Sequence, residues 1–139
     1  MLTLLSAAIG TAVAGPDEGS AGTEDLALLQ LINDYRAHQG LVRWRVEPGL
    51  QALAQSASRE MAALRRASHD GFSHRFERSG ALLCVEVIAR GRMPPAQAVG
   101  LWRRSPEHHR NLLEPRVHWA GVASFDGFTT VLACDTPAR

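Results

Sequence analysis

The sequence contains no lysine, so arginine supplies all 15 basic residues against 14 acidic ones, and the formal net charge is +1. A near-neutral balance does not favour nucleic acid as a partner, because that function requires a clustered basic surface. The pairs Arg65-Arg66 and Arg103-Arg104 are too short to form such a patch and are typical of solvated helix faces. We therefore predict no nucleic acid partner.

Several catalytic and metal-binding signatures are also missing. The chain has neither the H-E-x-x-H helix of many metalloproteases nor the G-x-S-x-G turn of serine hydrolases. It has only two cysteines, Cys84 and Cys134, and neither belongs to a C-x-x-C pair of the kind that binds zinc. In an exported protein the two would form one disulfide, and in a reducing compartment they would remain separate buried thiols. The sequence alone leaves both possibilities open.

The first 14 residues are apolar and small, and they end in Ala12-Val13-Ala14. This pattern, followed by the acidic and turn-rich segment 15–22, is typical of a secretory signal peptide. The stretch is too short to span a bilayer, so we predict no stable transmembrane anchor. It also lacks a basic residue before the apolar run, which keeps a disordered tail as the alternative. We predict a signal peptide over 1–14, a linker over 15–22, a folded domain over 23–139, and a secreted or periplasmic location.

Hydrophobic periodicity predicts helices in the first part of the domain and strands in the last part. This order indicates the α+β class, which we expect as a three-layer α-β-α sandwich around a small antiparallel sheet. Segment 68–80 is rich in Ser, Gly and His and is expected to be a loop. We expect a first helix from 24 to about 38, with Thr23 as its N-cap, a second from 47–48 to about 61, and a third from 94–95, with Ala98, Leu101 and Trp102 facing inwards. We expect strands over 82–89, 119–124 and 129–134.

Four segments, in this order, resemble the CAP superfamily (cysteine-rich secretory proteins, antigen 5 and pathogenesis-related 1 proteins), in its bacterial SCP-like branch. The most specific is W-x-x-S-P-x-H-x-x-N-L-L, which begins at Trp102. The others are N-x-x-R from Asn33 with Gly40-Leu41, the stripe Leu50, Ala54, Ala57 and Met61, and the loop S-H-D-G-F over 68–72.

The resemblance implies a shared cavity formed by His69, Glu86 and His108. His69 and His108 would bind a divalent metal such as Zn²⁺ through imidazole nitrogen. Glu86 stands alone in an apolar strand, and we interpret it as a hydrogen-bonded brace for one imidazole rather than as a ligand. The chain departs from the family in reading Val85-Glu86-Val87 instead of G-E-N. It also has Ser105, an expected N-cap beside the cavity, in place of a second glutamate.

Two main functions follow from this cavity, and an interaction protein with a vestigial cleft is a third and weaker one. The first is an exported, non-enzymatic module whose cleft binds a divalent metal or a small apolar ligand such as a lipid. The second is a metal-dependent hydrolase or peptidase using His69 and His108. The absence of a second carboxylate counts against the hydrolase, since it leaves no free general base.

Overall fold

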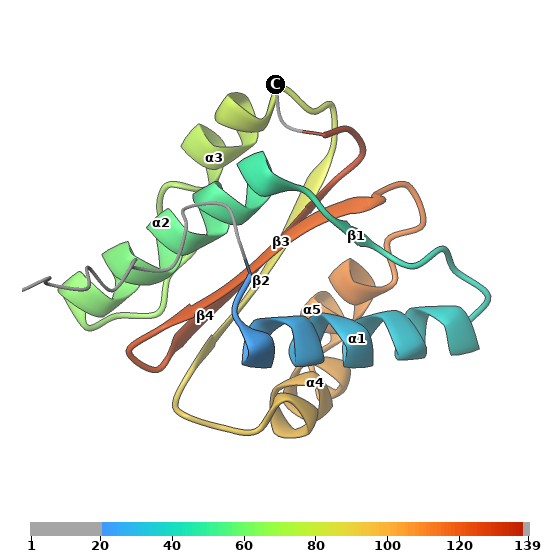
Figure 1. The fold of residues 1–139 in the computed structure, drawn as a ribbon, viewed down its shortest axis with the longest axis horizontal. Coiled ribbons are helices and arrows are strands. Elements are labelled where there is room, and N and C mark those ends of the chain that lie inside the picture. The colour runs from blue at the N-terminus through green and yellow to red at the C-terminus, as the bar shows by residue number, and fades with distance from the viewer. Residues whose placement is uncertain (1–20, 138–139) are drawn as a thin grey trace, which may run out of the picture.

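The computed structural model describes residues 21–137, and Figure 1 shows a four-stranded sheet between two layers of helices. The predicted signal peptide, most of the predicted linker and the last two residues lie outside this range. No helix in the described range has the length and apolar character needed to cross a membrane. The elements, in chain order, are α1 (Thr23–His38), β1 (Arg45–Val46), α2 (Pro48–Leu64), α3 (Phe72–Ser79), β2 (Cys84–Arg90), α4 (Pro95–Arg104), α5 (Pro106–Leu112), β3 (Trp119–Phe125) and β4 (Phe128–Cys134).

The sheet has the strand order β1-β3-β4-β2, so β2 lies at one edge. The three seven-residue strands are antiparallel, as predicted, and two-residue β1 adds a parallel pairing to β3. Helices α2 and α3 cover one face, and α1, α4 and α5 cover the other (Figure 1). The predicted α+β class and three-layer arrangement are confirmed.

Helix α2 lies against the sheet through polar groups as well as apolar ones. The buried amide of Gln51 accepts a hydrogen bond from the backbone N–H of Val122 at 2.8 Å and donates to its carbonyl. Buried Ser58 donates to the carbonyl of Ala123 at 2.9 Å. Gly121 allows this close approach, because a Cβ there would overlap the backbone carbonyl of Leu50. The α2–β3 packing therefore satisfies polar groups that are hidden from water.

The N-x-x-R residues of α1 have structural roles. The Asn33 side chain donates to the carbonyl of Trp44 at 2.8 Å and accepts from its N–H at 2.7 Å. Fully buried Arg36 donates to the carbonyls of Leu112 and Glu114, at 2.8 and 3.0 Å, just where α5 ends. Burial lowers the pKa of Arg36 to about 10. Arg36 thus supplies donors to carbonyls that the end of a helix leaves unpaired.

Three local predictions were wrong. Segment 68–80 contains helix α3, bounded by Gly71 and Gly80 in left-handed conformations. The N-cap of α1 is Gly22 rather than Thr23, with no side-chain cap bond, because the helix begins one residue earlier than predicted. Leu101 is 42% exposed, and Val99 is the residue that joins Ala98 and Trp102 in the core, since the buried face of α4 is rotated from the expected one.

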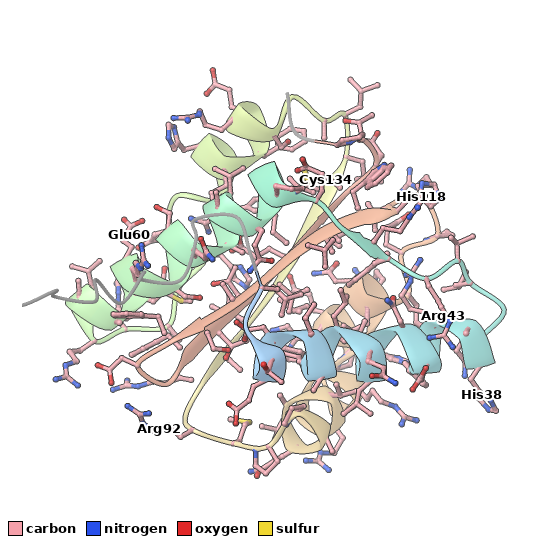
Figure 2. The ribbon with its side chains drawn as sticks, viewed as in Figure 1. His38, Arg43, Glu60, Arg92, His118 and Cys134 are labelled. Carbon is pink, nitrogen blue, oxygen red and sulfur yellow. A yellow bond between two sulfur atoms is a disulfide. The ribbon has the colours of Figure 1, made fainter. Side chains whose placement is uncertain are left out.

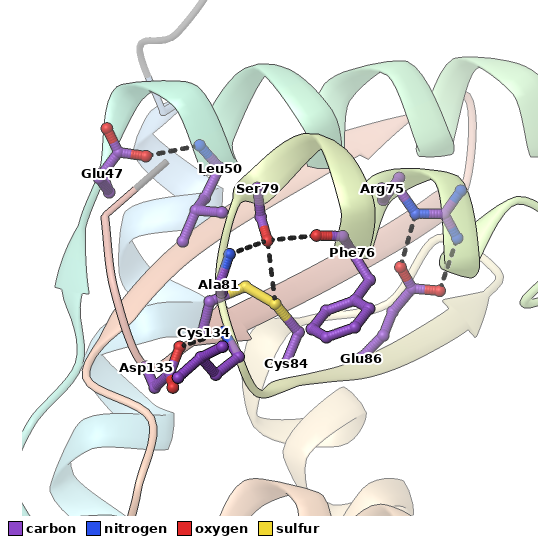
Figure 3. Close-up of a disulfide and its surroundings, with 11 residues drawn as sticks. Glu47, Leu50, Arg75, Phe76, Ser79, Ala81, Cys84, Glu86, Cys134 and Asp135 are labelled. Carbon is purple, nitrogen blue, oxygen red and sulfur yellow. Dashed lines mark hydrogen bonds and ion pairs between the residues drawn. A yellow bond between two sulfur atoms is a disulfide. The ribbon is translucent and has the colours of Figure 1, made fainter. Parts of the chain in front are cut away.

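The two cysteines form a disulfide, which resolves the alternative that the sequence left open. Cys84 and Cys134 are directly paired on β2 and β4, with Cα atoms 4.1 Å apart. Both are buried, and they pack with Leu50 and Leu132 under α2 and α3. Figure 3 shows the bridge beside the end of α3, where the Ser79 hydroxyl lies 3.5 Å from the Cys84 sulfur.

Candidate functional site

A cleft of about 410 Å³ opens beside the first half of β2. One wall comes from the start of α3 and the loop before it, and the other from α5. The cleft brings together the three residues that the sequence predicts for a cavity, His69, Glu86 and His108. Its full lining is His69, Phe72, Cys84, Val85, Glu86, Glu107, His108 and Asn111.

The centre of the cleft is a network around Glu86, whose side chain is 2% exposed. Arg75 of α3 makes two hydrogen bonds of 2.8 Å to the Glu86 carboxylate, one from Nε and one from Nη2 (Figure 3). The same carboxylate lies 3.0 Å from Nδ1 of His69. Arg75 also donates from Nη1 to the carbonyl of Asp70 at 3.2 Å, which ties the His69 loop to the network. The buried carboxylate therefore has a full charge partner, as a buried ion requires.

These hydrogen bonds determine the direction in which the pKa values of Glu86 and His69 are shifted. Burial alone would raise the pKa of Glu86, but hydrogen bonds from His69 and Arg75 and their charges outweigh burial and hold it below 4.5. The hydrogen bond to Glu86 raises the pKa of His69 above 6.5, against a smaller effect of burial. Since the carboxylate can only accept, Nδ1 of His69 carries the proton of this bond. Nε2 is then the nitrogen with an available lone pair in the neutral ring.

Helix α5 supplies the opposite wall. Its side chains Glu107, His108 and Asn111 all line the cleft. Asn111 donates to the backbone carbonyl of Glu86 at 3.4 Å, which links α5 to β2. Ser105 holds the predicted N-cap position of α5, without a side-chain cap bond, and it does not line the cleft.

The remaining histidines lie away from this cleft. His109 follows His108 on α5, and its Nε2 lies 2.6 Å from the Tyr35 hydroxyl on α1. His74 faces a separate hollow between α2 and α3. Figure 2 shows His38 at the end of α1, pointing outwards, and His118 ahead of β3.

Two residues of the site were missed from the sequence. Arg75 lies in the segment expected to be a loop, and no sequence pattern marks Glu107, in the first turn of α5, as part of the cavity. A signal for the helix existed, because Phe72 and Phe76 are four residues apart between two glycines, and both pack against the buried cluster of Leu50 and the two cysteines. Arg75 itself had no such signal, because a buried charged side chain adds nothing to hydrophobic periodicity.

Whether these residues fit a metal ion depends on which donor atoms remain. Both carboxylate oxygens of Glu86 already accept from Arg75 and His69, so Glu86 is not offered as a ligand. The imidazoles of His69 and His108 remain. Within residues 21–137, no group of three or more His, Cys, Asp or Glu side chains is arranged to hold a metal. Two imidazoles are one protein ligand fewer than the three of a typical open zinc site.

Comparison with known proteins gives a consistent picture. The model of the cysteine-rich secretory protein family, CAP, matches residues 29–131. No curated protein sequence matches the chain. Among solved structures, an extracellular protein with an SCP domain from Bacillus anthracis superposes with a TM-score of 0.76 at 23% identity, over 81% of this chain and 40% of that one.

Two further structures have the same fold. A cysteine-rich secretory protein from Staphylococcus aureus gives a TM-score of 0.74 at 13% identity, over 81% of this chain and 38% of that one. An outer surface protein from Borrelia burgdorferi gives 0.71 at 21% identity, over 84% of this chain and 95% of that one. The chain thus spans about two fifths of the first two proteins and nearly all of the third.

Proposed function

Because this chain belongs to the cysteine-rich secretory protein family, we propose that it is an exported binding module whose cleft holds a divalent metal ion between His69 and His108. The ion would be Zn²⁺ or a similar borderline ion, bound through neutral imidazole nitrogen. The proposal treats the domain as a binding protein rather than an enzyme. Its physiological partner would be whatever completes the coordination of the ion.

The hydrogen bond between His69 and Glu86 is the observation that carries this proposal. Histidines that bind metals usually donate their second N–H to a carboxylate or carbonyl, which fixes the tautomer and the ring orientation. In this protein Glu86 is the carboxylate that accepts from His69, and Arg75 in turn holds Glu86 with two hydrogen bonds. The lone pair of the His69 Nε2 is therefore available to a metal ion, in a cleft that His108 also lines.

The character of the lining favours an ion over a lipid. Of the eight lining residues, Phe72, Val85 and the bridged Cys84 are apolar, and the other five are polar or ionisable. Sites for apolar ligands are lined mainly by hydrophobic and aromatic side chains. A small apolar or lipid ligand is therefore the weaker form of the binding hypothesis for this cleft.

Export is supported by two observations. The Cys84–Cys134 disulfide is of the kind that persists in oxidising compartments outside the cytosol. The structural relatives from Bacillus anthracis and Borrelia burgdorferi are described as an extracellular protein and an outer surface protein. N-terminal sequencing of the native protein, together with its location after cell fractionation, tests this part of the proposal. Met1 intact in the cytosolic fraction would contradict it.

Calorimetric Zn²⁺ titration tests the metal site. We expect modest affinity in the wild type and none in His69→Ala or His108→Ala, because each variant removes one of two protein ligands. Glu86→Gln should weaken binding less, since it loosens the orientation of His69 without removing a ligand. The matched control is His38→Ala, which removes an exposed imidazole far from the cleft and should bind as the wild type does. Equal binding by the wild type and the double histidine variant would refute the metal site.

One observation supports a second candidate, a metal-dependent hydrolase. The sequence predicts no free general base, yet Glu107 lies in the cleft near enough for its charge to act on His69. A bound ion would supply an acidified water, and Glu107 would be the carboxylate available to take its proton. Turnover of a peptide and ester library with added Zn²⁺, lost in Glu107→Gln while Zn²⁺ binding persists, would favour this candidate.

A further inference from the structure

The cleft lies on an open edge of the sheet. Strand β2 pairs only with β4, so one side of its seven residues has no strand partner. Such an edge presents backbone N–H and C=O groups that another extended chain can pair with. Which of these groups are available depends on the direction in which each residue of β2 points.

Two sets of hydrogen bonds establish that direction. The backbone N–H of Asp135 donates to the carbonyl of Leu83, so the backbone groups of Leu83 point towards β4. Alternation along an antiparallel strand then turns the backbone groups of Cys84, Glu86 and Ile88 outwards. The outward carbonyls of Glu86 and Ile88 indeed accept from side chains of the neighbouring helices, Asn111 of α5 and Trp102 of α4, at 3.4 and 2.8 Å.

The helices therefore cover the second half of the edge and leave the first half to the cleft. Two of the outward groups in that half, the carbonyl of Cys84 and the N–H of Glu86, flank Val85. Within residues 21–137, neither group bonds to a side chain or to a backbone group outside the sheet. The same three residues line the cleft, between the wall of His69 and Phe72 and the wall of α5. The cleft is thus bordered by one backbone acceptor and one backbone donor, spaced as in a sheet, in residues that are themselves only 9% and 4% exposed.

We propose that the cleft binds an extended peptide segment that adds to the outer edge of β2 at Cys84 and Glu86. One peptide N–H donates to the Cys84 carbonyl, and one peptide carbonyl accepts from the Glu86 N–H. This is strand addition, in which backbone bonds supply affinity and flanking side chains supply selectivity. The inference rests on the proposed function in placing the peptide in the metal cleft, where its side chains or carbonyls meet His69 and His108.

The probe is a library of N-acetylated, C-amidated pentapeptides in which threonine alternates with a varied residue. It is screened against the full-length protein by NMR, in EDTA and in Zn²⁺. The best binder should slow hydrogen exchange at the Glu86 amide at least about tenfold, since it gains a partner. The matched control is the amide of Val87, which already faces β4 and should not change. N-methylation of the one peptide nitrogen that faces Cys84 should weaken binding about tenfold, whereas methylation of the next nitrogen should not.

Two results would overturn the proposal: no library member slows exchange at Glu86 in either condition, or the best binder tolerates N-methylation at every position. The screens in EDTA and in Zn²⁺ distinguish this proposal from the proposed metal site. Peptide addition in EDTA together with a failed Zn²⁺ titration would refute only the metal site. Zn²⁺ binding with no effect of any peptide on Glu86 would refute only the strand addition.

Discussion

Arg75 and Glu86 face one another across the junction of α3 and β2 and are joined by two hydrogen bonds of 2.8 Å (Figure 3). Both side chains are almost completely buried, at 6% and 2% exposed. Removing either partner would leave the other as an uncompensated ion in a site that excludes water. The pair therefore connects the orientation of His69 to the folding of the domain.

Arg75→Met should destabilise the protein by about 3–5 kcal/mol, because it leaves the Glu86 carboxylate buried without its charge partner. The double variant Arg75→Met/Glu86→Leu should recover much of that loss, since it removes both ions. Urea unfolding provides the measurement. Arg78→Met, an exposed position on the same helix, is the control and should change stability by less than about 0.5 kcal/mol. An Arg75→Met variant as stable as Arg78→Met would contradict the structural importance of the pair.

The stability contributed by His69 should depend on pH. Its hydrogen bond to Glu86 raises the pKa of the folded-state imidazole above 6.5, so protonation favours the folded state. The contribution is full below pH 6.5 and is lost as the pH rises through the folded-state pKa. The cost of His69→Ala in unfolding experiments should be greater at pH 5.5 than at pH 8.5, by no more than about 1 kcal/mol for this half-exposed ring. A pH difference that persists in the Glu86→Gln background would disprove the role of Glu86.

Zn²⁺ affinity should have the opposite pH dependence from the contribution of His69 to the free energy of unfolding. Binding needs neutral imidazole, so protons compete with the metal. Because the pKa of His69 is raised by Glu86, affinity should begin to fall at a pH above 6.5 as the solution is acidified. Glu86→Gln should move that loss to lower pH, although it also weakens binding. Titrations at several pH values measure this, and an unchanged pH profile in Glu86→Gln would count against the His69–Glu86 coupling.

Loss of the disulfide should cost about 4 kcal/mol in the chain-entropy estimate, since the bridge joins residues 50 positions apart. The variant is Cys84→Ala/Cys134→Ala, compared with the wild type by thermal or urea unfolding under non-reducing conditions. Adding a reductant supplies the control, because the reduced wild type should approach the stability of the variant. Coincident unfolding curves without reductant would show that the bridge contributes nothing.

Two glycines provide a matched pair for the packing of α2 on β3. Gly121→Ala should destabilise by at least about 2 kcal/mol, because the new Cβ would overlap the backbone of Leu50 and neither element can yield. Gly100→Ala in α4 meets nothing within 4 Å and should stabilise by about 0.5–1 kcal/mol, since alanine favours a helix. Thermal unfolding of both variants distinguishes them. Similar effects of the two substitutions would show that α2 can move away from β3.

Elements that bury apolar side chains were predictable from the sequence. The stripe of Leu50, Ala54, Ala57 and Met61 identifies α2, and all four are buried. The long strands were found for the same reason. The cavity residues were a different matter, because His69 and His108 are 39 positions apart and only the family resemblance placed them together.

Elements defined by tertiary context were not predictable. Helix α3 has only eight residues, and its inward side combines buried Arg75 and Ser79 with the pair Phe72 and Phe76, which is a short apolar signal in a segment rich in Ser, Gly and His. Strand β1 has only two residues and exists because β3 offers it a parallel partner. The edge position of β2 could not be read from the chain either, since it depends on the order in which strands assemble.

The disulfide also controls which way the side chains of β2 face. A strand that slipped by one residue would turn Glu86 from Arg75 towards the apolar layer of α1 and α4, because successive side chains point to opposite faces. The covalent bond between Cys84 and Cys134 prevents that shift at the first residue of the strand, next to the open edge. The disulfide therefore fixes the register of β2 against β4. The strand addition proposed above would thus leave the pairing of β2 with β4 in place.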